Sequence, residues 1–404
     1  MAAAYRREWA YVLAATLRVT GDIDVAEECV QDAFSRALTA WPKSGIPSNE
    51  GAWLTTVARR RAIDVLRRAS TQGRVLVKLV EPESGSIPND VDLSSVSDDR
   101  LRLIFTCCHP ALSLESQVAL TLKLLCGLST AEVARAFLVS ESTMAARITR
   151  AKNKISTSHI PYRVPEIEDL PARVDAVLSV IHLVFTTGHT APLGADLMRR
   201  DLVERALDLS RMMRALLPED PDVAGLLALI LLTDARHETR IGADGTLVLL
   251  SEQDRSRWDR RAIEEGSELI RDALGQRLDG PFVLMAAIAA VHAEAPSWES
   301  TDWHEIVGLY DLLLVTWPSP VVALNRAVAI GLADGPAAGL SALSELSSDR
   351  QLLSYTYLAS ARADFLRRLG RVEEARTAYQ EAIGCCENEI ERTFLVGRLQ
   401  ELGV

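Results

Sequence analysis

The chain has 404 residues, of which 48% are hydrophobic and only 5% aromatic, and its formal net charge is −11. This length accommodates roughly two to four domains, and the lack of long alternating β-branched runs predicts an all-α protein. The six cysteines lack the spacing of a zinc site or a disulfide framework, which favours a reduced, cytoplasmic protein. No uncharged apolar run approaches about 18 residues, so no membrane span is predicted.

The net charge of the whole chain argues against a nucleic-acid partner, but the charge is distributed unevenly along the chain. Residues 1–160 hold 20 Lys and Arg against 17 Asp and Glu, a net +3. Residues 161–404 hold 24 Arg, no Lys and 38 acidic residues, a net −14. This difference in charge indicates two functional halves, and only the first has a net charge that suits binding to a polyanion.

The first predicted domain, residues 1–75, contains amphipathic helices over 8–20, 24–40 and 50–69. The second of these helices has an acidic outer face, which suits a basic protein partner better than DNA. Its members are Glu27, Glu28, Gln31 and Asp32.

The third predicted helix is strongly basic. Only Asp64 opposes its arginines, which are Arg59, Arg60, Arg61, Arg67 and Arg68. This density predicts a phosphate-binding surface, with a solvated basic face as an equally good interpretation. The preceding loop, 42–51, lies between Trp41 and Trp53, and such a loop suits an unstacked base; core packing is the more common role of tryptophans in this position.

Residues 76–97 are rich in Ser, Pro, Asp and Gly and are predicted to form a flexible linker. A second compact domain follows at 98–158. We expect its helices near 99–108, 114–126, 131–138 and 141–156.

The last two of these helices have the pattern of a helix-turn-helix. Ser129 and Glu132 form a capping box for the first, and Ser140 can cap the second. The second helix has one apolar face, made by Met144, Ile148, Ala151 and Ile155. Its other side carries hydroxyl groups and cations suited to a major groove, namely Ser142, Thr143, Arg147, Arg150 and Lys154. An ordinary amphipathic hairpin is the alternative.

A connector at 159–175 leads to a long helical domain at 176–404. One interruption at 240–250 contains Asp244-Gly245 and predicts a short hairpin or loop. Weak self-similarity over 300–390 predicts stacked tetratricopeptide-like hairpins. The histidines are scattered without ligand spacing, and there is no nucleophile or phosphate-loop motif, so we predict no metal, no cofactor and no enzymatic activity.

The segments DVAEECVQDAFSRAL and AWLTTVARRRAIDVLRR resemble region 2 of the extracytoplasmic-function (ECF) sigma factors, small members of the sigma-70 family. The run from DDRLRLIFTCCHPAL to MAARITRAKNKI resembles their region 4. The segments DGTLVLLSEQDRSRWDR and PFVLMAAIAAVHAEAPS resemble the C-terminal extension of one subgroup, whose members carry a tetratricopeptide-like domain.

The resemblance implies partners and roles. The acidic helix with Glu28, Gln31 and Asp32 would dock on the β′ clamp of core RNA polymerase, and region 4 would meet the β flap. The loop 42–51 and the helix carrying Arg59, Arg60, Arg67 and Arg68 would open the minus-10 element of promoter DNA. Residues Ser142, Thr143, Arg147, Arg150 and Lys154 would read the minus-35 element, and the linker would thread toward the RNA exit path.

Alternatives remain open at this point. A stand-alone helix-turn-helix regulator with a tetratricopeptide-like sensory domain would also use the second predicted domain, but leaves the basic helix unexplained. The acidic C-terminal domain could inhibit the sigma modules by competing with DNA. It could instead contact them, or another protein, and be required for activity.

Overall fold

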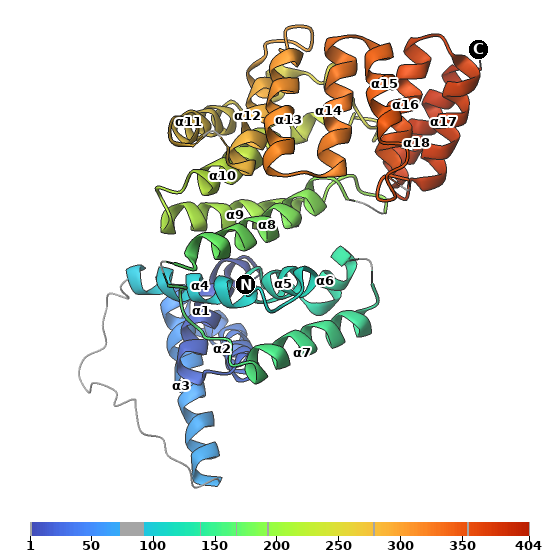
Figure 1. The fold of residues 1–404 in the computed structure, drawn as a ribbon. Helices are drawn as coiled ribbons and strands as arrows, with labels where there is room; N and C mark the ends of the chain where they lie inside the picture. The colour runs from blue at the N-terminus through green and yellow to red at the C-terminus, as the bar shows by residue number, and fades with distance from the viewer. Residues whose placement is uncertain are drawn as a thin grey trace. The chain divides into compact units, whose positions relative to one another are not determined.

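The computed structural model describes residues 2–72, 93–137, 139–166, 168–191, 194–277, 279–353 and 355–403. These residues form helices joined by short connections (Figure 1), and no β-strand occurs among them. The all-α prediction is therefore confirmed. The chain divides into two compact units, Met1–Ile181 and His182–Val404.

The first unit begins with a bundle of three helices, α1 (Ala2–Thr20), α2 (Ile23–Ser44) and α3 (Glu50–Gln72). Each helix packs against the other two. Their apolar faces meet around side chains that are fully buried or nearly so, including Trp9, Leu13, Ala33, Leu54 and Ala58. The expected three-helix organisation of this part is confirmed.

The end of α2 differs from the expectation. The sequence predicted a helix over 24–40 and a turn from Pro42, but α2 continues to Ser44 with Pro42 inside it. Trp41 is buried and its ring meets that of Trp53 edge-on at 5.6 Å, which stabilises the last turn. Gly45 ends the helix with φ +85°, and its N–H donates to the carbonyl of Trp41 at 3.0 Å.

The rest of the first unit includes α4 (Leu93–Cys107), α5 (Leu114–Leu120), α6 (Thr130–Phe137) and α7 (Glu141–Thr157). Helix α4 begins at Leu93, earlier than the expected start near residue 99. The expected helix over 114–126 is α-helical only to Leu120 and continues as the π-helical turn η1 (Thr121–Leu125). Most of the predicted linker, 76–92, lies outside the described residues.

Helix α8 (Leu170–His189) contains the boundary between the two units. Among the helices of the described ranges, α8 is the only one whose length and apolar composition would allow it to cross a membrane. Leu178 and Ile181 on this helix are fully buried in the protein, which is typical of a core helix.

After the end of α8, the second unit continues with α9 (Arg200–Leu216), α10 (Pro221–Asp234), α11 (Arg260–Gln276) and α12 (Pro281–Glu294). Helix α10 is buried on nearly all sides. It approaches α12 so closely that a Cβ on Gly225 would lie 2.6 Å from the backbone nitrogen of Val283, so only glycine fits there. The hairpin expected at 240–250 is present, with Ile241 bridging Leu247 and Gly245 at φ +81°. Three short 3₁₀ turns, His237–Thr239, Leu250–Glu252 and Arg255–Arg257, flank it.

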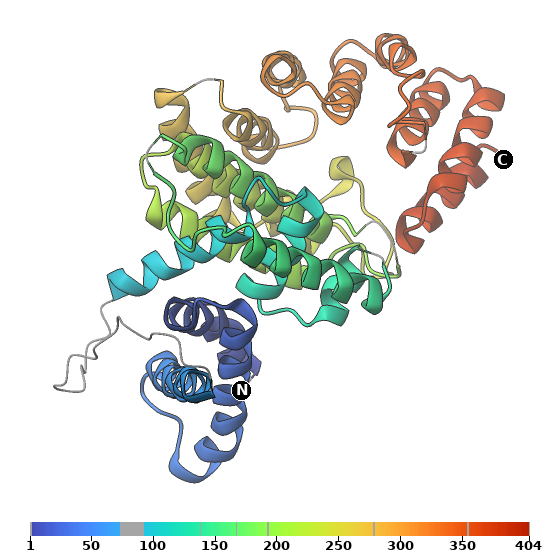
Figure 2. The same ribbon diagram turned by 60° about the horizontal axis from the view of Figure 1, so that its bottom comes forward.

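Among the residues of the second unit that the structure describes, six further helices follow, and each packs against its neighbours in sequence. They are α13 (Trp303–Thr316), α14 (Pro320–Ala333), α15 (Pro336–Glu345), α16 (Thr356–Arg368), α17 (Val372–Cys385) and α18 (Glu389–Glu401). In Figure 2 these orange to red helices form a curved row. Ala363 and Leu366 of α16 interlock with Ala375 and Tyr379 of α17 in one apolar cluster. This arrangement agrees with stacked helical hairpins, while the tetratricopeptide assignment itself stays a prediction.

Candidate nucleic-acid and protein interface

The arginines of α3 divide into two groups. Arg60, Arg67 and Arg68 are exposed along the helix. Arg59 is half-buried, and burial followed by the nearby charge of Arg18 lowers the pKa of its guanidinium. Arg59 is therefore set back from the exposed basic surface that its three neighbours make.

Arg61 faces the acidic helix rather than solvent. Its guanidinium lies 3.7 Å from Asp32 and 3.8 Å from Glu28, both on α2. Asp32 also pairs with Arg36 at 3.0 Å. Glu28 and Gln31 are exposed, so the predicted polymerase-facing residues do share an accessible surface, with Asp32 partly neutralised by two arginines.

The helix-turn-helix is built by the caps that the sequence predicted. The backbone N–H of Ser129 donates to the Glu132 carboxylate at 2.7 Å, and the N–H of Glu132 donates to the Ser129 hydroxyl at 3.2 Å. The N–H of Thr143 donates to the Ser140 hydroxyl at 3.2 Å, which caps α7. The apolar face is confirmed without exception, because Met144, Ile148, Ala151 and Ile155 are the buried residues of α7.

The opposite face of α7 is mostly open to solvent. Ser142, Thr143, Arg150 and Lys154 are exposed. The Ser142 and Thr143 hydroxyls share hydrogen bonds with Ser140 at 3.0 and 2.8 Å, so they are held near the start of the helix. Arg147 is 20% exposed and pairs with Glu115 of α5 at 3.0 Å, a contact that the sequence did not reveal.

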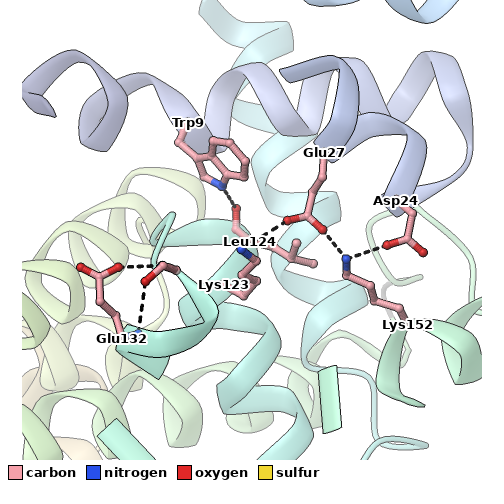
Figure 3. A network of polar contacts seen from close by, with 8 residues as sticks. Trp9, Asp24, Glu27, Lys123, Leu124, Glu132 and Lys152 are labelled. Atoms are coloured by element: carbon pink, nitrogen blue, oxygen red, sulfur yellow. Dashed lines mark hydrogen bonds and ion pairs between the residues drawn. The ribbon is translucent and has the colours of Figure 1, made fainter. Parts of the chain in front are cut away.

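A cluster of charges joins α2 to the α4–α7 part of the first unit, and Figure 3 shows it from close by. Glu27, expected on the outer face of α2, is instead buried with 6% of its surface exposed. Its carboxylate accepts a hydrogen bond from the ammonium of Lys152 on α7 and lies 3.8 Å from the ammonium of Lys123. Lys152 also donates to Asp24 at 2.7 Å. The four residues Asp24, Glu27, Lys123 and Lys152 are called the Glu27 cluster below.

The Glu27 cluster contains two carboxylates and two ammonium groups, so its charges balance. Burial alone would lower the pKa of Lys152, but Glu27 and Asp24 outweigh it and raise that pKa above its usual value. A carboxylate and an ammonium that are nearly closed off from water stabilise each other, and removal of either one leaves the other charge buried without a partner. The cluster therefore fixes α7 against α2.

A second connection links α1 to the π-helical turn. The indole N–H of Trp9 donates to the carbonyl of Leu124 at 3.0 Å, and Trp9 is 1% exposed (Figure 3). In the π-helical turn η1 a backbone N–H donates to the carbonyl five residues earlier rather than four. An example is the bond from the Cys126 N–H to the Thr121 carbonyl at 3.1 Å. Such turns leave a carbonyl available to an outside donor.

The sequence contained one signal for this interface. Glu27 follows Ala26 and precedes Val30, so it stands inside the buried stripe of α2 rather than beside it. Its partner, Lys152, is adjacent to buried Ala151 on α7. No group of three or more potential metal ligands occurs in the part of the chain that the structure describes.

Comparisons with known proteins find family matches in both units of the chain. The sigma-70 region 2 family matches residues 4–72, and sigma-70 region 4 matches residues 102–155. A family of unknown function, DUF6596, matches residues 173–274.

Two relatives extend these matches. An uncharacterized protein of Rhizobium meliloti (strain 1021) is 41% identical over 394 residues, which cover 96% of this chain and 93% of that protein. A probable ECF RNA polymerase sigma factor, SigI, of Mycobacterium tuberculosis is 32% identical over 167 residues. That alignment covers 40% of this chain and 56% of the relative.

Proposed function

Because the chain belongs to the ECF sigma factors of the sigma-70 family, in a form with a helical C-terminal extension, we propose that it directs core RNA polymerase to promoters by reading two elements. The observation that carries the proposal is α7, a capped helix with one buried apolar face and an exposed face of hydroxyls and cations. Such a helix has the chemistry of a major-groove reader.

Two surfaces would contact promoter DNA. Ser142, Thr143, Arg150 and Lys154 of α7 would meet the minus-35 element, joined by Arg147 once it leaves Glu115. Arg60, Arg67 and Arg68 of α3, with the loop 42–51, would engage the minus-10 element. Arg59 would act from behind this surface, since its guanidinium is partly enclosed.

The acidic surface of α2 would contact polymerase rather than DNA. Glu28, Gln31 and Asp32 would dock on the β′ clamp, and the α4–α7 module would meet the β flap. Charge complementarity of this kind steers association and sets orientation.

The Glu27 cluster implies that the protein must open on DNA. Elements named for positions −10 and −35 are roughly 25 base pairs apart, or about 85 Å at 3.4 Å per base pair. Lys152 lies on the reading helix itself and is bonded to α2 at 2.7 Å. Simultaneous reading of both elements therefore requires α7 to leave α2 and the Glu27 cluster to break.

The test uses the full chain with core RNA polymerase on a promoter that it transcribes in vivo. Arg147→Ala combined with Arg150→Ala should reduce specific transcription at least 10-fold while core binding persists. Arg163→Ala, which removes an exposed arginine outside α7, is the matched control. Undiminished transcription by the double variant would refute the role of α7. Tight dimeric footprinting without polymerase would indicate a stand-alone regulator instead.

For the C-terminal unit we propose a supporting role, with its net charge of −12, from 22 Arg and 34 Asp and Glu over residues 182–404, assisting contacts to protein rather than to DNA. Because the first unit extends to Ile181 and α8 ends at His189, the chain is best truncated after His189. Lost promoter-directed output would agree with a required domain. Increased output would show inhibition.

A further inference from the structure

The second unit contains a large cavity whose walls run from α8 to α18. Its volume is about 1100 Å³, just above the usual range of small-molecule sites. Every lining residue belongs to the second unit. The cavity is thus separate from the surfaces assigned to DNA and polymerase.

One wall of the cavity is cationic. Arg236 and Arg240 come from the segment after α10, and both line it. Arg240 is 7% exposed and is held in place by donating to the carbonyl of His189 and, at 3.3 Å, to the hydroxyl of Thr190. Arg236 forms no ion pair with any carboxylate in the described part of the chain.

Both arginines remain charged at neutral pH. Burial lowers the pKa of each guanidinium to about 10, and for Arg236 the charge of Arg240 contributes. Glu391 and Asp234 oppose part of this fall in pKa for Arg240, but no carboxylate does so for Arg236. An anion placed beside Arg236 would therefore offset the cost of enclosing two cations together.

The histidines beside these arginines add no charge. Burial, followed by the charge of Arg236, lowers the pKa of His292 to about 4. Burial and then Arg240 and Arg236 hold the pKa of His189 well below its usual range. Neutral imidazoles supply hydrogen-bonding groups while leaving the positive potential to the guanidinium groups.

The carboxylates of the cavity already have partners. Asp364 accepts from Arg367 at 2.6 Å, and Glu391 accepts from the hydroxyl of Tyr357 at 2.6 Å. Glu391 is close enough to Arg240 to oppose part of the fall in its pKa. Arg236 is therefore the cation best placed to meet a ligand.

Aromatic side chains make much of the remaining wall. Trp258 is 4% exposed, and its indole N–H is fixed by the Thr239 hydroxyl at 3.1 Å. Tyr310, Tyr355 and Phe394 also line the cavity. Rings held in this way offer flat apolar contacts to a ligand body.

We propose that this cavity binds a small organic anion, with its charged head on Arg236 and its aromatic or aliphatic body against the rings. The ligand contacts helices from both ends of the second unit, since the lining extends from His182 to Arg398. A bound ligand stabilises that unit by mass action.

The test titrates the full chain with two fluorescent probes that share an aromatic body. One is the anion 8-anilinonaphthalene-1-sulfonate, and the other is the uncharged N-phenyl-1-naphthylamine. Arg236→Gln should weaken sulfonate binding about 10-fold, equivalent to about 1.4 kcal/mol, and leave binding of the neutral probe unchanged. Arg257→Gln, which alters an exposed arginine that does not line the cavity, should bind both probes like the parent.

Thermal unfolding of each variant checks that the fold is retained. Equal binding of the sulfonate to the parent and to Arg236→Gln would overturn the proposal. Equal loss of both probes in a variant with an unchanged midpoint would also overturn it, because recognition would then not depend on charge.

Discussion

The ammonium of Lys152 on α7 is bonded to the carboxylate of Glu27 on α2, although 125 residues separate them in the chain. Side-chain exposures of 12% and 8% mean that neither charge is well solvated. This pair connects the helix proposed to read DNA to the helix proposed to bind polymerase.

Breaking this pair on one side should destabilise the first unit. Glu27→Gln leaves Lys152 enclosed without a full counter-charge, and the expected loss is about 3 kcal/mol in the free energy of unfolding. Urea unfolding of the full chain measures it. Glu115→Gln is the control. The Glu115 carboxylate, which pairs with Arg147, is 68% exposed, so its removal should lower the free energy of unfolding by under about 1 kcal/mol. Equal losses for the two variants would contradict the role of the Glu27 cluster.

Replacing both partners by apolar residues should recover most of that stability. The double variant Glu27→Leu with Lys152→Met removes both enclosed charges of the pair. Lys123, whose ammonium lies 3.8 Å from Glu27, is then the one cation of the cluster that loses its partner. We expect the double variant to be more stable than either single variant. A double-mutant cycle in urea gives the coupling energy, and additive effects would show that the two residues act independently.

Releasing Arg147 should strengthen DNA binding by the holoenzyme. Glu115→Gln removes the carboxylate 3.0 Å from the Arg147 guanidinium. Because Arg147 then reaches DNA without first breaking this ion pair, promoter affinity should rise a few-fold, whereas Arg147→Ala should reduce the magnitude of the slope of log K against log salt by about 0.9. Filter binding over a salt series measures both quantities. An unchanged slope in Arg147→Ala would mean that Arg147 contacts no phosphate.

Asp32 and Glu28 should affect polymerase binding without affecting promoter choice. Asp32→Ala combined with Glu28→Ala removes the acidic surface and also frees Arg61, so affinity for core polymerase should fall about 10-fold. Competition against a second sigma factor measures this affinity. Glu141→Ala changes an exposed acid on α7 and serves as the control. A larger loss in the control would place the polymerase contact elsewhere.

Acid should weaken the second unit through its buried histidines. Burial lowers the pKa of His182 and of His292 from 6.5 to about 4. Between these values the unfolded chain binds the proton and the folded chain does not, so stability falls as the pH falls. At about pH 5 each histidine costs about 2 kcal/mol.

A variant tests this origin of the acid sensitivity. His182 packs edge-on against Phe282 at 5.6 Å and Trp317 at 6.2 Å, so His182→Phe keeps an aromatic ring there. The loss of stability between about pH 7.5 and about pH 5 should shrink by about 2 kcal/mol in urea unfolding. An unchanged loss would assign the acid sensitivity to other groups.

Local patterns allowed much of the fold and one part of the site to be predicted. The caps at Ser129 and Ser140, and the buried face of α7, depend on residues three or four apart, and the predictions for them are confirmed. The pairs Lys152–Glu27, Arg147–Glu115 and Arg61–Asp32 were missed. They join different helices, and which charges meet depends on packing that no local spacing encodes.

The hydrogen bond from Trp9 to the Leu124 carbonyl gives the protein a built-in optical reporter. While the α1–α3 bundle holds the π-helical turn, this indole is shielded from water, and we expect its emission at shorter wavelength than that of a solvated indole. Separation of the two parts removes the acceptor and admits water to a ring that is now 1% exposed. Because the chain has seven tryptophans, a variant that keeps Trp9 alone would report this separation as a shift of its emission to longer wavelength.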